Sequence, residues 1–219
     1  MLKKIKSLFI TKNILIYLDE KRKLKLIKYS KRLKDKIDIN LINYQLFSGR
    51  YIIYEQNGKG KEYNAEDDNL VFEGEYLKGE RNGKGKEYKN GKLIFKGNYL
   101  NGKRNGKGKE YDNNKIIFEG EYLNGERNGK GREYKNNKFI FEGEYLNGER
   151  NGKGREYKNG ELIFKGEYLN GKRNGKGKEY EDGNLKSEGN YLNGKKHGNF
   201  IFYNYHNDKK FKNIINVYL

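Results

Sequence analysis

The chain has 219 residues and carries 48 Lys/Arg against 30 Asp/Glu, a net charge of +18. It contains no Cys, which excludes disulfides and thiol catalysis and favours a cytoplasmic location. Its mean hydropathy is low, at −1.18, but 14% of its residues are aromatic, a content typical of a thin folded structure rather than of a disordered chain.

The first 46 residues differ in pattern from the rest. Leu26, Leu33 and Ile37 recur at helical spacing, and we predict a basic block of two or three short helices over residues 1–46. Residues 1–48 hold 13 Lys/Arg and 4 Asp/Glu, so their net charge of +9 is half of the total. We expect the most crowded basic residues to contact an anionic surface: Lys21, Arg22, Lys23, Lys25, Lys28, Lys31 and Arg32.

The segment "NILIYLDEKRKLKLIKYSKRL", residues 13–33, resembles an F-box in its spaced leucines and its final Lys-Arg-Leu. It lacks the Leu-Pro with which an F-box usually opens, which puts an adaptor role in doubt. The alternative is a helical cap that covers the open edge of the first strand and prevents edge-to-edge aggregation.

A repeat of 23 residues organises the chain after this block. "FEGEYLNG" begins at Phe118 and Phe141, and close copies begin at Phe72, Phe95 and Phe164. Each copy is followed by "NGKGKEY" or "NGKGREY". Because fixed periods of this length are typical of repeat architectures, we predict one repeat domain rather than several globular domains.

The repeat continues in altered form at both ends. "FSGRYI" from Phe47 and "HGNFIFY" from His197 are degenerate units, as expected of the caps of a repeat stack. We therefore place the repeat domain at 47–205. The remaining residues, 206–219, are predicted to form a capping strand or a tail.

One unit reads as a β-hairpin. Phe118, Gly120 and Tyr122 alternate as on one face of a strand, and Asn124–Gly125 has the preferred residues of a two-residue type I′ turn. We predict a mainly β fold, an elongated single-layer antiparallel β-meander of about seven hairpins with a small helical block before it. Strands about 4.8 Å apart would make it roughly 65–70 Å long.

Strand parity assigns the glycines of the second strand to the aromatic face. With regular pairing, Gly129 and Gly131 lie beside Phe118 and Tyr122, where the absence of a side chain leaves room for the rings. Glu133 falls on the same face, and the pattern offers no reason for a carboxylate there.

The opposite face is predicted to carry cross-strand ion pairs, of Lys130 and Arg132 with Glu119 and Glu121. The alternative is that Gly-Lys-Gly holds a nucleotide phosphate. A P-loop, however, needs four residues between its first two glycines and a Ser or Thr after its lysine, and "GERNGKG" has neither.

These units resemble MORN repeats in three features: Phe-x-Gly-x-Tyr, Leu-Asn-Gly-x-Arg and Asn-Gly-Lys-Gly. The resemblance covers about residues 47–203 and is closest to the variant class, because its second-strand tyrosine lies one residue later than the common spacing. Tyr also stands where the family often has Trp. The resemblance implies a non-enzymatic scaffold for protein–protein interaction and, for some members, attachment to membranes or phosphoinositides.

No catalytic, cofactor-binding or metal-binding pattern stands out, since His197 and His206 have no ligand-like neighbours and no nucleophile motif appears. We expect other proteins, or further copies of this chain, as partners, in the cytoplasm, at a membrane surface or on the cytoskeleton. The charge also permits nucleic acid, but the repeat lysines have glutamate neighbours. The expected partner face carries Tyr76, Tyr99, Tyr122, Tyr145 and Tyr168.

We predict that any attraction to anionic membranes resides in the basic block. The repeat lysines face glutamates, whereas residues 1–48 have few acids to offset their charge. In vesicle sedimentation, the full chain should bind anionic lipid and residues 47–219 should not. Equal binding by the shortened chain would contradict this localisation.

Overall fold

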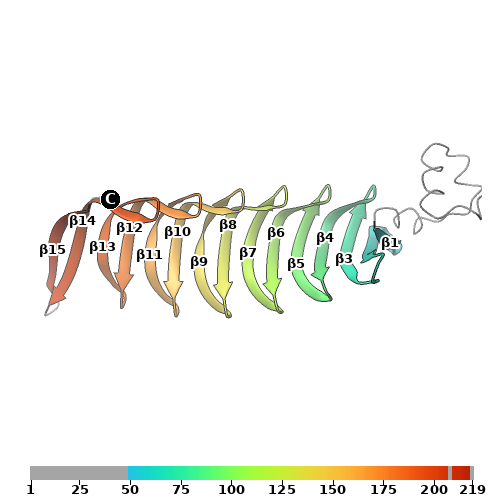
Figure 1. Cartoon of the computed structure of the whole chain (residues 1–219), viewed down its shortest axis with the longest axis horizontal. Helices are drawn as coiled ribbons and strands as arrows, with labels where there is room; N and C mark the ends of the chain where they lie inside the picture. The colour runs from blue at the N-terminus through green and yellow to red at the C-terminus, as the bar shows by residue number, and fades with distance from the viewer. Residues whose placement is uncertain (1–48, 207–208, 218–219) are drawn as a thin grey trace, which may run out of the picture.

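The computed structural model describes residues 49–206 and 209–217, in which 15 strands form one antiparallel sheet. Every strand pairs with the strands before and after it in the sequence, so the sheet is a meander without crossovers. Figure 1 shows the strands side by side in a single row from β1 to β15. The predicted single-layer meander is confirmed. The F-box-like segment and the basic block lie outside the described residues.

The strands of the repeats are mostly nine or ten residues long, and shorter strands precede them. A short 3-10 turn, η2 (Gln56–Gly58), joins the first two strands. The strands are β1 (Arg50–Tyr54), β2 (Lys59–Asn64), β3 (Leu70–Leu77), β4 (Glu80–Lys89), β5 (Lys92–Leu100), β6 (Lys103–Asp112), β7 (Lys115–Leu123), β8 (Glu126–Lys135), β9 (Lys138–Leu146), β10 (Glu149–Lys158), β11 (Glu161–Leu169), β12 (Lys172–Glu181), β13 (Asn184–Leu192), β14 (Lys195–His206) and β15 (Lys209–Val217).

Two-residue turns connect the strands from β3 to β14, as the Asn-Gly pairs predict. Asn124 and Gly125 have φ angles of 53° and 99°, the positive values that a type I′ turn requires at both central residues. The N–H of Gly125 also donates to the carbonyl of Arg104 in the preceding unit, at 2.9 Å. The same bond recurs from unit to unit, so the turn tips stack in a row along one edge of the sheet.

A bulge in each hairpin changes the predicted register. Tyr122 pairs with Arg127 and Gly120 pairs with Gly131, so three residues of β8 lie opposite Glu121 alone. Gly131 therefore lies beside Phe118, as predicted. The position predicted for Gly129 is wrong, because the bulge turns this residue to positive φ (92°) against the side chain of Glu121.

The core is a column of aromatic rings on one side of the sheet, which we call the aromatic face. Phe141 is fully buried, and its ring contacts Tyr145 edge-on within its own unit and Tyr168 of the next unit, with centroids 5.9 and 5.2 Å apart. The same alternation runs from Tyr76 to Phe200. Since such pairs stabilise beyond the area that they bury, the column joins neighbouring units.

We predict that Gly154→Ala destabilises the sheet by about 1–3 kcal/mol, the usual cost of overpacking. A Cβ at Gly154 would lie 2.6 Å from Cζ of Phe141 and 2.9 Å from Cε2 of Tyr168. Urea unfolding followed by circular dichroism measures the effect.

The matched control is Gly160→Asn, at a turn position with open space around it, where the equivalent Asn137 already has φ 62°. Its midpoint should stay close to that of the wild type. Equal midpoints for the two variants would show that the rings do not require the glycine.

Candidate binding surfaces

Glu133 on the aromatic face has a partner that the sequence pattern did not reveal. Its carboxylate accepts the Tyr145 hydroxyl at 2.6 Å and the Arg150 guanidinium at 2.9 Å from Nε and 2.6 Å from Nη2. The same guanidinium lies 3.9 Å from the centroid of the Phe141 ring. Arg150 thus covers the core ring of its own unit while it binds the carboxylate of the preceding unit.

This arrangement, which we call the clamp, recurs along the sheet. Each clamp joins the glutamate of one unit to the tyrosine and the arginine of the next: Glu62 with Tyr76 and Arg81, Glu87 with Tyr99 and Arg104, Glu110 with Tyr122 and Arg127, and Glu156 with Tyr168 and Arg173. In the last unit, Lys196 replaces the arginine and binds Glu179 at 2.6 Å. The signal was present in the sequence, because five units have Arg before Asn-Gly and six second-strand tyrosines are preceded by Glu.

The clamp sets the ionisation of its members. Burial by itself would raise the pKa of Glu133, but the hydrogen bonds from Arg150 and Tyr145 outweigh burial and hold this pKa below its ordinary value. Burial, followed by the hydrogen bond to Glu133, raises the pKa of Tyr145 well above its ordinary value. The carboxylate is therefore ionised and the phenol neutral across the physiological range.

The tyrosines expected to form a partner face lie within this core. Tyr99, Tyr122, Tyr145 and Tyr168 are only 3–4% exposed, and Tyr76 is partly buried. Their hydroxyls donate to the clamp glutamates, so these tyrosines stabilise the sheet. Whether a partner also contacts this face stays a prediction.

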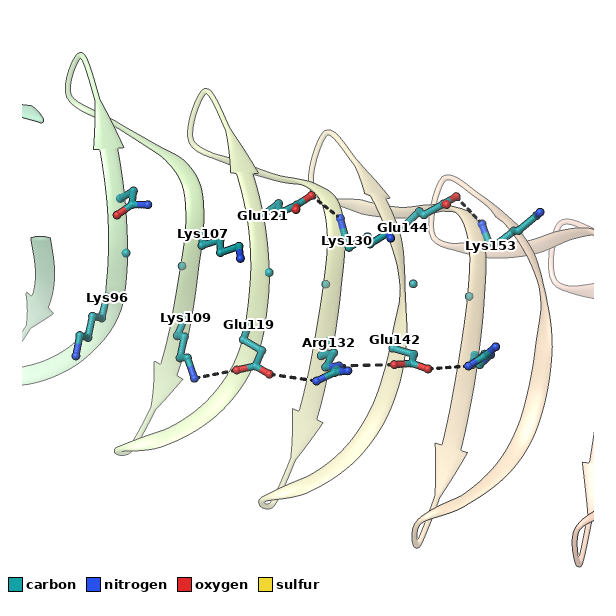
Figure 2. Close-up of a pocket in the computed structure, with 18 of the residues that line it drawn as sticks. Lys96, Lys107, Lys109, Glu119, Glu121, Lys130, Arg132, Glu142, Glu144 and Lys153 are labelled. Atoms are coloured by element: carbon teal, nitrogen blue, oxygen red, sulfur yellow. Dashed lines mark hydrogen bonds and ion pairs between the residues drawn. The ribbon is translucent and has the colours of Figure 1, made fainter. Parts of the chain in front are cut away.

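The opposite side of the sheet, which we call the charged face, forms an open groove of about 1860 Å³ along the units. Glu119 lies between Lys109 and Arg132, at 2.9 and 3.9 Å, as the predicted ion pairing requires (Figure 2). The predicted pairing of Glu121 with the Lys130 ammonium is corrected. The Glu121 carboxylate accepts the backbone N–H of Lys130 at 3.0 Å instead, because the bulge turns that N–H toward it.

A comparison with protein-family models gives one match, described as the MORN repeat, at residues 72–92, 95–115, 118–138, 141–161, 164–185 and 188–199. These segments make up more than half of the chain and coincide with the hairpins. The chain belongs to the MORN repeat family. No curated protein matches it.

Two solved structures resemble the MORN repeat chain weakly. They are TarM and a mutant of S. aureus TarM in complex with Fondaparinux, alpha-GlcNAc-glycerol and UDP, each with a TM-score of 0.31 and 15% sequence identity. Each match covers 63% of this chain. This chain spans about a quarter of the length of TarM: 27% of the mutant chain and 26% of the other.

The MORN units also carry a surface that the sequence reasoning did not single out. The leucine before each Asn-Gly or Lys-Gly turn is 38–59% exposed. We call these residues the leucine row: Leu77, Leu100, Leu123, Leu146, Leu169 and Leu192. Because the turn tips stack, neighbouring leucines lie about 10 Å apart along one edge. The signal was a leucine at a turn in every repeat, where a polar residue would be expected.

Other sites are not found in the described part of the MORN chain. Residues 49–206 and 209–217 hold no group of His, Asp and Glu that could bind a metal ion. Over the same ranges, no helix is long and apolar enough to cross a membrane. The seven basic residues expected to meet an anionic surface lie in residues 21–32, outside the described ranges.

We predict that Glu133→Gln destabilises the MORN sheet by on the order of 3 kcal/mol at neutral pH, because it leaves the Arg150 guanidinium without its counter-charge. A carboxyl with a lowered folded-state pKa contributes stability above its unfolded pKa, about 4.3, and loses it as the pH falls through the folded value. The wild type should therefore weaken steeply below about pH 4.3, and the variant less steeply. Urea midpoints at several pH values measure both effects.

Glu126→Gln is the matched control, since Glu126 is exposed at a turn. It should leave the midpoint and the pH profile unchanged. Identical profiles for the two variants would show that the clamp does not stabilise the sheet.

Proposed function

We propose that this MORN repeat chain is a non-enzymatic scaffold that binds other proteins along the leucine row. The observation that carries the proposal is the exposure of the same leucine in six successive units, in register, at one edge of a stiff sheet. Exposed apolar side chains that gather in this way mark interaction surfaces. A repeat sheet presents such a surface at constant spacing, which suits it to a long partner or to several copies of a short one.

The charges around the leucine row favour a protein over a membrane. The residue after each turn glycine is Glu80, Lys103, Glu126, Glu149, Lys172 or Lys195, so three negative and three positive charges are mixed along the edge. An anionic membrane attracts uniformly basic borders, whereas a protein surface can match a mixed pattern. Self-association of the chain through this edge falls within the proposal.

The alternative function is peripheral binding to anionic lipid or phosphoinositide membranes. The observation that favours it is the net charge of +9 in residues 1–48. It would leave the leucine row without a role in membrane contact. Two further functions have less support. An F-box-type adaptor rests only on the basic block, and a nucleic-acid binder rests only on the overall charge. We place the scaffold in the cytoplasm, free, at a membrane surface or on the cytoskeleton.

We predict that replacing Leu100, Leu123 and Leu146 by Ser abolishes protein capture. Half-exposed leucines that become buried contribute about 1 kcal/mol each, so the triple variant should lose roughly two orders of magnitude in affinity. Quantitative pull-down from native lysate measures the loss. The wild-type complexes should persist at high salt, because screening does not weaken apolar burial.

The matched control replaces Lys115, Lys135 and Lys138 by Ser, which changes exposed residues at the opposite turns. This variant should capture the same proteins as the wild type. The proposal fails if the leucine variant captures them equally well, or if the wild type recovers nucleic acid alone.

A further inference from the structure

The charged face carries a row of alternating charge that crosses the strands. Glu119, Arg132 and Glu142 follow one another on β7, β8 and β9, with Arg132 3.9 Å from Glu119 and 3.6 Å from Glu142. Arg155 on β10 continues the row at 3.1 Å from Glu142. Each charge in this stretch thus has an opposite charge beside it, and the groove there is nearly neutral.

The alternation breaks at two strands. Lys96 on β5 occupies the position of Glu119, and its register partners are Lys86 and Lys109. Lys165 on β11 occupies the same position three units later, between Arg155 and Lys178. In residues 49–206 and 209–217, no carboxylate lies within ion-pair distance of Lys96 or Lys165. Each break therefore sets three cations in a row, of which the outer two pair with a carboxylate on their other side and the central lysine does not.

The break at β5 is the stronger of the two. Asn98 stands there where β7 has Glu121. Lys84 and Lys107 therefore have one neighbouring glutamate each, Glu75 and Glu121, whereas Lys130 has two. Figure 2 shows Lys107 and Lys109 on the strand next to that of Lys96. Like charges directly opposite each other destabilise a sheet. A groove wall also concentrates their field, so an anion that lies between them would be held.

The distance between the breaks and the charges between them define the occupant. Lys96 and Lys165 lie six strands apart, about 29 Å along the sheet. Glu119, Glu142 and the glutamates one row above, Glu121 and Glu144, line the groove in that interval. Because the cations beside these glutamates balance them, the interval offers no net attraction to a continuous polyanion such as nucleic acid. A protein segment with two separate acidic clusters would place its charge only at the breaks.

We infer that the groove binds a protein segment carrying two acidic clusters about 29 Å apart, one at Lys96 and one at Lys165. Such a spacing corresponds to about nine residues of extended or polyproline II chain. The inference rests on the proposed scaffold function, because it takes the occupant to be a protein. It adds the chemistry of that partner and a second surface, distinct from the leucine row.

The probe is a labelled peptide of three glutamates, six prolines and three glutamates. Its cluster centres lie nine residues apart, about 28 Å in polyproline II form, and the stiff spacer removes most of the cost of extension. A second peptide has two prolines, which brings the centres to about 16 Å. A third is an unbroken run of twelve glutamates, and oligothymidylate of twelve nucleotides represents nucleic acid. Binding to the full chain is followed by fluorescence anisotropy.

The test variant is Lys96→Glu with Lys165→Glu, which restores at both breaks the residue that Glu119 and Glu142 provide elsewhere. This change makes new ion pairs with neighbouring cations, so the variant should remain folded. The matched control is Lys115→Glu with Lys138→Glu, which changes the net charge equally away from the groove, where Glu161 shows that the position accepts a glutamate.

The expected result is that the six-proline peptide binds about tenfold tighter than the two-proline peptide, because only the former engages both sites. Binding should weaken at high salt, disappear in the groove variant and persist in the control variant. The inference is overturned if spacing has no effect, if the groove variant binds normally, or if polyglutamate or oligothymidylate binds as well as the spaced peptide. If it is overturned while capture through the leucine row persists, the scaffold function stands and only the groove assignment falls.

Discussion

The rest of this structure depends on one constraint: a single-layer sheet has no second layer to cover its apolar side, so its aromatic rings must be buried against its own backbone. The paired glycines Gly143 and Gly154 provide the space, and the Phe141 ring lies over them with no exposed surface. Any side chain on these glycines would occupy the volume of the ring. The second glycine of Gly-Lys-Gly is therefore explained by the core and the first by the bulge, where Gly152 has a φ of 92°. A phosphate-binding loop is not needed to account for the motif.

The clamp follows from the same constraint. A ring on an open sheet still has one face toward solvent, and the Arg150 guanidinium covers that face of Phe141 at 3.9 Å. An arginine in this place needs a counter-charge, and Glu133 of the preceding unit supplies it. Core, cation and carboxylate thus come from two units, so a unit completes its core only when a neighbour is present. Stability of this kind grows with the number of units, as in other repeat proteins.

The two candidate binding surfaces lie where the residues do not contribute to the aromatic core. The positions of the leucine row and of the charged face take no part in burying the rings, so their residues can vary without disturbing the core. Lys96 and Lys165 replace glutamate at equivalent places, and the strands keep their register. The leucines keep their identity in all six turns although they are exposed. Both features are what a surface with a partner would show, and they motivate the two binding proposals.

The sequence by itself determined the period, the two-residue turns and the side of each strand that carries the rings, because alternation and Asn-Gly are local signals. It also excluded a P-loop by spacing alone. Only the tertiary structure decided the bulge that moves Gly129 away from the rings and turns the Lys130 N–H toward Glu121, because a register shift depends on both strands of a hairpin. The tertiary structure also explains why a carboxylate, Glu133, lies on the aromatic face. Its partners Tyr145 and Arg150 lie 12 and 17 residues later in the sequence and contact it only when successive units stack.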